Sequence, residues 1–382
     1  PHTRQPIRPG SPALSRLPSY DMEPNAHMTE ITPFLKQLLS LPGLSGQEEP
    51  VRSVIEEAWR PLVDELTTSR LGSLHGLRRG SGPEPRPRIL LSAHMDSIGL
   101  MVTAVVDGLL RFTQVGGVDP RILPGQLVTV HGREDLPGIV VQPPDRLLPP
   151  AAREKPVAME YLLVETGLLP ADVSRLVRVG DLISFAQPPQ ELTGETITGH
   201  TLDNRASVAA VTICLQELQR VAHTWDVYAV ATVQEENILG GAFTSPFEIR
   251  PQIGVAIDVT FAKGPGVSDY RGYPLGKGPT IGYGPNIHPA LHRRFKELAE
   301  KLDIPNNTEV MPRHSGTDAF AMQVVAEGIP SIVIGIPLRY MHTPVELVSL
   351  KDIQRVGHLL AEFIARLEPD TVSKIKWEEN NP

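Results

Sequence analysis

The chain has few of the features that mark secreted, membrane-bound or nucleic-acid-binding proteins. It contains one cysteine, Cys214, which cannot form an internal disulfide and lies in the apolar stretch 206–215. We expect a small buried hydrophobic residue there, and a reducing cytoplasm is the simplest location for such a chain. No apolar run approaches the roughly 20 residues that a membrane-spanning helix needs.

Positive charge is in deficit as well. The chain has 36 Lys and Arg against 44 Asp and Glu, a net charge of −8, and no basic stripe. This argues against nucleic acid or an anionic membrane as the main partner. Residues 1–27 mix Pro, Arg and Ser and lack the apolar core of a signal peptide, so we interpret them as a flexible N-terminal tail before the folded chain.

The sequence does contain an alternation of helix and strand patterns. Residues 31–41 have helical spacing, and Ser45 with Glu48 forms a capping-box pattern that predicts a second helix. The remaining predicted strands are 88–94, 226–233, 253–259 and 330–336, and the remaining predicted helices are 203–221, 289–302, 317–327 and 350–367. This alternation predicts an α/β fold, with a three-layer α/β/α catalytic domain.

The middle of the chain has a different pattern. Asp107-Gly108 separates two β-prone runs, a strong hairpin signal, and short strand patterns follow up to residue 185. Residues 102–193 therefore predict an inserted small β-rich domain, PDZ-like or barrel-like, with an exposed proline-rich loop at 143–156. The catalytic domain would then comprise residues 28–101 and 194–370, followed by a C-terminal tail at 371–382.

Ionisable side chains gather where the predicted α/β strands end or a helix begins. They are His94, Asp96, Asp203, Glu235, Glu236, Asp258 and His342. Ligand sites of open α/β sheets form at the carboxyl ends of the strands. Mixed sets of imidazoles and carboxylates suit Zn²⁺ and similar divalent ions. The sequence therefore predicts a metal site at this edge of the sheet.

Each of these residues has a simpler interpretation when it is taken alone. A histidine at a strand end is more often hydrogen-bonded or on the surface than a ligand, and Asp203 is an ordinary helix N-cap. The simpler interpretation is weakest at Glu235 and Glu236, two acids directly after an apolar run. Because neighbouring side chains of a strand point to opposite faces, we expect these two carboxylates to have separate tasks.

Six short segments carry a resemblance to a known family. They are AHMDSIG (93–99), LDNRAS (202–207), QEE (234–236), IDVT (257–260), SGTDA (315–319) and RYMHTPVE (339–346). In this order they resemble the tetrahedral aminopeptidases, a family of glutamyl and deblocking aminopeptidases, and the resemblance extends from about residue 29 to 368.

The resemblance implies hydrolysis of N-terminal residues from peptides with two divalent metal ions per subunit, zinc or cobalt. Asp203 would bridge both ions. His94 and Asp258 would complete one site, and Glu236 and His342 the other. The family's self-assembly implies homo-dimers and dodecamers, with the β-rich insertion forming subunit contacts.

The resemblance also implies roles around the metal ligands. Glu235 would be the general base, passing a proton from a metal-bridging hydroxide or water to the leaving amine. Asp96 would orient His94 through its other ring nitrogen, and the Asp203–Asn204 peptide would be cis. The roles of His200 and His314 stay open.

Three other functions are considered. A related dinuclear amidohydrolase, such as a deacylase or carboxypeptidase, would share the ligands. A glycosidase needs two free carboxyls across a sugar, which an adjacent pair does not supply. A non-catalytic assembly shell is disfavoured because no ligand position is missing. The preferred N-terminal residue and the native metal are not determined by the sequence.

Overall fold

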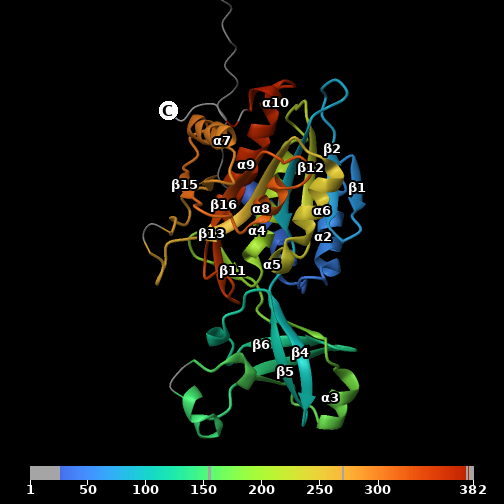
Figure 1. Cartoon of the computed structure of the whole chain (residues 1–382), viewed down its shortest axis with the longest axis vertical. Helices are drawn as coiled ribbons and strands as arrows, with labels where there is room; N and C mark the ends of the chain where they lie inside the picture. Colours follow the sequence, from blue (N-terminus) through green and yellow to red (C-terminus); the bar gives the residue numbers. More distant parts are fainter. Residues whose placement is uncertain (1–25, 154–155, 269–270, 376, 378–382) are drawn as a thin grey trace, which may run out of the picture.

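The computed structural model describes residues 26–153, 156–268, 271–375 and 377 of the chain. A large α/β domain carries a smaller β domain that projects from one end (Figure 1). Most of the predicted N-terminal tail lies outside the described residues, and its last two residues already belong to helix α1 (Ala26–Leu39). No helix in the described part of the chain is both long and apolar enough to cross a membrane.

The large domain is built on an 11-stranded mixed sheet within the described residues. Four neighbouring strands at its centre run parallel: β12 (Asp226–Thr232), β3 (Arg88–His94), β13 (Ile253–Phe261) and β16 (Ser331–Arg339). Their residues are almost all buried, as expected for parallel strands covered on both faces. The other strands are β1 (Glu65–Thr68), β2 (Leu74–Arg78), β10 (Gln190–Leu192), β11 (Thr196–Gly199), β14 (Thr280–Tyr283), β15 (Asn307–Val310) and β17 (Glu346–Ser349).

Helices cover both faces of this sheet. Helix α4 packs with α1, α2, α9 and the strands β3 and β13, while α6 packs with α8 and strand β12. The bounds of these helices are α2 (Glu49–Trp59), α4 (Leu202–Glu217), α6 (Gly240–Ile249), α7 (Pro289–Lys301), α8 (Asp318–Gln323) and α9 (Leu350–Ala365). The predicted α/β fold with layered helices is confirmed. Most of the predicted helices and strands occur within a few residues of their predicted bounds.

The smaller domain is a closed β-barrel with its own apolar core. Its strands, in barrel order, are β4 (Gly99–Val106), β5 (Leu109–Val115), β8 (Leu163–Glu165), β7 (Asp135–Val141), β6 (Leu127–His131) and β9 (Leu182–Phe185). The predicted hairpin turn is confirmed, since Asp107 and Gly108 both have positive φ, 50° and 82°. Strand β10 pairs in the large sheet, and the division of the chain at 102 and 193 stays a prediction.

Some local predictions differ from the structure. The capping box is wrong: α2 starts at Glu49, its N-cap Glu48 makes no side-chain cap, and Ser45 lies outside the helix. The described part of the predicted loop 143–156 contains two short 3-10 turns, η2 (Asp145–Leu147) and η3 (Pro150–Ala152). The first residues of the predicted C-terminal tail form α10 (Thr371–Lys374).

Candidate metal centre

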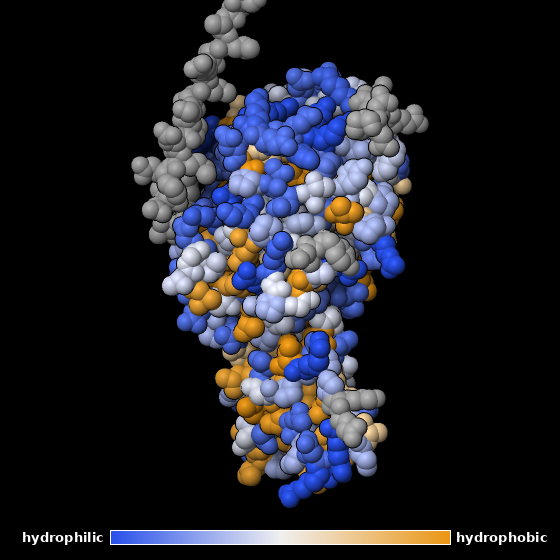
Figure 2. Space-filling model, turned by 90° about the vertical axis from the view of Figure 1, so that its left-hand side faces the viewer, coloured by the Kyte–Doolittle hydropathy of each residue, from blue (hydrophilic) through white to orange (hydrophobic). Residues whose placement is uncertain are grey.

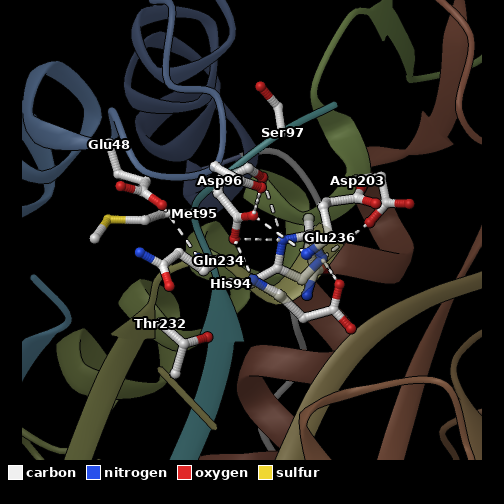
Figure 3. A network of polar contacts seen from close by, with 12 residues as sticks. Glu48, His94, Met95, Asp96, Ser97, Asp203, Thr232, Gln234 and Glu236 are labelled. Carbon is white, nitrogen blue, oxygen red and sulfur yellow. Dashed lines mark hydrogen bonds and ion pairs between the residues drawn. The ribbon is translucent and has the colours of Figure 1, made fainter. Parts of the chain in front are cut away.

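The site lies where the central parallel strands end. His94 is the last residue of β3, Asp258 lies in β13, and the turn that carries Glu235 and Glu236 follows β12. Asp203 enters from the start of α4 and His342 from the loop after β16. Figure 3 shows His94, Asp203 and Glu236 pointing toward one another from these separate elements. The structure thus brings all five predicted metal ligands together.

Asp203 lies between the two imidazoles. Its Oδ1 is 3.2 Å from Nε2 of His94, and its Oδ2 is 3.4 Å from Nε2 of His342. The Asp203–Asn204 peptide bond is cis, as expected from the resemblance. One carboxylate that faces a different imidazole with each oxygen has the arrangement that bridging of two ions requires.

The other acids complete two groups around Asp203. Asp258 Oδ1 lies 3.9 Å from His94 Nε2, and Glu236 Oε2 lies 3.4 Å from His342 Nε2. Ligand atoms about 2.1 Å from one tetrahedral ion are themselves roughly 3.4 Å apart. The separations between these donors are therefore those of ligands that share an ion.

Glu235 also lies close to these ligand atoms. Its Oε2 lies 3.7 Å from His94 Nε2, and the ligand atoms of His94, Glu235 and Asp258 all lie within 4.8 Å of one another. The same holds for those of His94, Asp203 and Glu236. Distance alone therefore does not separate Glu235 from the ligands. The difference is that Glu236 faces His342, whereas Glu235 has no hydrogen-bond partner for its carboxylate among the described residues.

The backbone explains how neighbouring acids reach one site. The expectation of opposite strand faces is wrong, because β12 ends at Thr232 and Gln234 has a left-handed conformation with φ 59°. Glu235 then opens the short helical turn α5 (Glu235–Ile238). Successive side chains of a helix leave about 100° apart, so both carboxylates can point into the site from different angles.

Asp96 organises this turn. Its Oδ1 accepts a hydrogen bond from the Glu235 backbone N–H at 3.0 Å, and its Oδ2 accepts from the Glu236 N–H at 3.2 Å and from the Ser45 hydroxyl at 2.5 Å. The His94 Nδ1 is 3.2 Å from the Asp96 backbone oxygen and 3.5 Å from its carboxylate. Asp96 therefore holds His94 mainly through its carbonyl and the Glu235–Glu236 turn through its carboxylate (Figure 3).

Sequence reasoning missed two further buried acids that position the site. Glu346 accepts hydrogen bonds from the backbone N–H of Asp203 at 3.0 Å and of His342 at 2.9 Å, so it joins the two segments. Glu48 accepts a hydrogen bond from the Gln234 N–H at 3.1 Å, at the start of the Glu235–Glu236 turn. Glu346 could have been found from its place in the last family-like segment, residues 339–346. Glu48 could not, because its spacing from Ser45 fits a helix capping box.

The donor set carries more negative charge than its own cations balance. Burial raises the pKa of Glu235 well above its ordinary value, the His94 charge opposes this, and the charge of Asp258 adds to it. Burial alone would lower the pKa of His342, yet its hydrogen bonds to the Asp203 and Glu236 carboxylates raise it to about 11. Divalent ions would offset this negative charge, so the residues present fit such ions.

His200 and His314, whose roles the sequence leaves undetermined, lie outside these ligand groups in the described part of the chain. The His200 ring packs edge-on against Phe185, with ring centroids 5.0 Å apart. Burial, and then the Arg205 charge, lower the pKa of His200 to about 3, so it stays neutral. His314 packs against Phe320 at 5.1 Å between ring centroids.

Known proteins resemble the chain in sequence and in fold. A family model described as M42 glutamyl aminopeptidase matches residues 72–359. A lysyl aminopeptidase from Pyrococcus furiosus is 34% identical over 346 residues, which cover 88% of this chain and 97% of that protein. The structure of a TET aminopeptidase from Thaumarchaeota archaeon SCGC AB-539-E09 has a TM-score of 0.87 at 30% identity, covering 92% of this chain and all of that one.

A further solved structure is relevant to assembly. The Pyrococcus horikoshii TET1 peptidase, described as able to form a tetrahedron or a large octahedral shell, has a TM-score of 0.77 at 29% identity. The match covers 88% of this chain and 100% of that one.

Proposed function

Because this chain belongs to the M42 glutamyl aminopeptidase family and is therefore a peptide hydrolase, we propose that it removes N-terminal residues from peptides at the centre around Asp203. The observation that carries the proposal is the pair of oxygens of Asp203, each facing a different imidazole, with an uncommitted Glu235 beside them. A bridged pair of ions next to a free carboxylate suits hydrolysis of an amide.

Two divalent ions, zinc or cobalt, would be held by this set. Asp203 would bridge them, His94 and Asp258 would complete one site, and Glu236 and His342 the other. Such ions supply electrophilic polarisation of the scissile carbonyl and make a bound water more acidic. Three ligand carboxylates bring −3 against +4, so the filled site would keep about one net positive charge for the developing oxyanion.

Glu235 would act as the general base. Its carboxylate would accept a proton from the attacking water and donate it to the leaving amine, because it lies 3.7 Å from His94 Nε2 and no hydrogen bond within the described residues fixes it. Asp96 would keep the Glu235–Glu236 turn in place through its two backbone hydrogen bonds. Glu346 would hold the bridging Asp203 and His342 at a fixed separation.

We also propose self-assembly into dimers and dodecamers, with subunit contacts from the barrel. The barrel domain exposes large apolar side chains, among them Leu127 at 61%, Leu169 at 72% and Val179 at 65%. Figure 2 shows hydrophobic residues gathered over this narrow lobe, a pattern typical of an interaction surface. A closed shell would admit small unfolded peptides as substrates.

The test is a panel of aminoacyl nitroanilides with purified enzyme. We expect hydrolysis that a chelator abolishes and that zinc or cobalt restores, and a particle about twelve subunits in mass. N-acetylated versions of the same substrates are the matched control, since an aminopeptidase requires a free amine. Cleavage of N-acyl amino acids or of C-terminal residues instead would favour the deacylase or carboxypeptidase alternative, and no hydrolysis with metal present would favour the non-catalytic shell.

A further inference from the structure

Three side chains of the barrel domain form a hydrogen-bonded relay outside the metal centre. Ser184 Oγ lies 2.8 Å from His131 Nε2, and His131 Nδ1 lies 2.8 Å from Asp135 Oδ1. An ionised carboxylate only accepts hydrogen bonds, so the Nδ1–H of His131 donates to Asp135. In the neutral imidazole, Nε2 then accepts the hydrogen bond of the Ser184 hydroxyl. This order of hydroxyl, imidazole and carboxylate activates a serine for nucleophilic attack.

The register of the barrel strands brings the three residues together. His131 pairs with Asp135 across the β6–β7 hairpin, and Ser184 of β9 pairs with Thr129, two residues before His131. Ser184 and His131 are therefore diagonal neighbours on one face of the sheet, within reach of an imidazole. This is the outer face, because the residues that alternate with them in β6 and β9 belong to the barrel core. Asp135 is exposed, His131 is half-buried and Ser184 is buried, so the relay runs inward from the surface.

The relay borders a cavity of about 330 Å³ between the barrel and the large domain. All three relay residues line this cavity, and the large domain contributes residues 39–42, His200 and Thr201 to its lining. The volume lies in the size range of small-molecule sites. The buried hydroxyl of Ser184 is thus placed where a small ligand would contact it.

Two unpartnered polar side chains line the same cavity. His200 is 5% exposed and Thr201 is 2% exposed. Among the described residues, neither ring nitrogen of His200 nor the hydroxyl of Thr201 has a hydrogen-bond partner. Because buried polar groups are normally hydrogen-bonded, these two side chains indicate a polar ligand. The neutral His200 ring and the Thr201 hydroxyl each offer one donor, and uncommitted donors near a nucleophile suit a developing oxyanion.

We propose that Ser184 is the nucleophile of a second catalytic site, which hydrolyses small uncharged esters. Leu39, Leu41 and Phe185 line the cavity and suit the apolar acyl group of such an ester. Lys and Arg are missing from the described residues that line it, so an anionic substrate has no ion-pair partner there. The five proposed metal ligands lie outside this lining, and the inference does not depend on the proposed aminopeptidase function.

The reaction has two steps. Ser184 Oγ attacks the carbonyl carbon of the ester while His131 Nε2 takes the hydroxyl proton, and the donors of His200 and Thr201 are available to the carbonyl oxygen. The bond from the carbonyl carbon to the alcohol oxygen breaks, and His131 gives its proton to the departing alcohol. Water then attacks the acyl group on Ser184 by the same route, so one ester and one water give one carboxylic acid and one alcohol.

The first test is covalent labelling of the purified enzyme. A fluorophosphonate probe should modify Ser184 with loss of fluoride, as located by tandem mass spectrometry. His131→Gln should slow this labelling ~100-fold, since a general base contributes a factor of roughly 10² to 10⁴. Ser174→Ala is the matched control, because Ser174 lies in the same domain and donates its hydroxyl hydrogen bond to the Pro170 carbonyl, and it should leave the labelling of Ser184 unchanged. An unlabelled Ser184, or an unchanged rate in His131→Gln, overturns the proposal.

The second test separates this site from the metal centre. Hydrolysis of p-nitrophenyl acetate should persist in a chelator that abolishes aminoacyl nitroanilide hydrolysis, and it should fall ~100-fold in Ser184→Ala. An unchanged circular dichroism spectrum shows that the variant folds, and Ser184→Cys, which keeps a nucleophile, should still be acylated. Ester hydrolysis that stops with the chelator, or that continues in Ser184→Ala, occurs elsewhere and overturns the proposal while leaving the aminopeptidase assignment intact. Ester hydrolysis at Ser184 without any nitroanilide hydrolysis would support this site and count against the aminopeptidase assignment alone.

Discussion

The adjacent acids Glu235 and Glu236 allow a test of the site with unusual resolution. Glu235→Gln removes the proposed base but keeps the shape of the side chain. Its carboxylate makes no hydrogen bond in the described structure, and its turn is held by the backbone bonds to Asp96, so folding should be unaffected. General acid–base catalysis contributes a factor of roughly 10² to 10⁴ to the rate. We therefore expect kcat to fall by a factor of this size or more, with KM little changed.

Glu236→Gln is the matched variant one residue away. Glu236 faces the His342 imidazole at 3.4 Å, so its loss should remove a metal ligand and weaken binding of one ion ~10- to 100-fold or more. The assay is kcat on an aminoacyl nitroanilide together with metal content by mass spectrometry after dialysis. Full metal content with lost turnover in Glu235→Gln, and lost metal in Glu236→Gln, is the expected pair. The reasoning fails if Glu235→Gln loses metal to the same extent or keeps full turnover.

Two further predictions concern the surroundings of the site. Ser45→Ala removes the 2.5 Å hydrogen bond to buried Asp96 and should lower activity ~10- to 100-fold. Ser53 donates its hydroxyl hydrogen bond to Glu49 at the surface, so the control Ser53→Ala should keep full activity. Steady-state kinetics of both variants test this prediction. In the metal-free protein, folding raises the pKa of His342 to about 11. The stability that this shift contributes is fully present below the unfolded pKa and is lost as the pH rises through the folded pKa. The raised pKa of Glu235 likewise makes stability fall as the pH rises. Chemical denaturation in EDTA should therefore show stability falling from about pH 6.5 to 11, and a flat or rising profile would contradict the charge balance.

Much of the site was predictable because strand ends are recognisable in sequence. Buried apolar runs that stop at His94, before Glu235 and at Asp258 mark the carboxyl edge of a parallel sheet, where side chains from distant segments meet. The order of the quoted segments then identified Asp203 and His342, whose neighbours in sequence give no periodic signal.

Other features depended on three-dimensional contacts that no local pattern encodes. Ser45 and Glu48 fit a capping box, but in the fold Ser45 bonds Asp96 and Glu48 bonds the backbone at Gln234. Tertiary hydrogen bonds to Asp96 and to the backbone at Gln234 therefore replace the local capping bonds. The Glu235–Glu236 pair was predicted from strand geometry, whereas the left-handed Gln234 starts a helical turn there.

The central claim is that Asp203 bridges two ions held by His94, Asp258, Glu236 and His342. Anomalous diffraction from crystals of the zinc-loaded enzyme tests it most directly. The account predicts two anomalous peaks roughly 3.5–4 Å apart, one beside each oxygen of Asp203, with Glu235 bound to neither. A single peak, peaks away from Asp203, or direct ligation by Glu235 would contradict it.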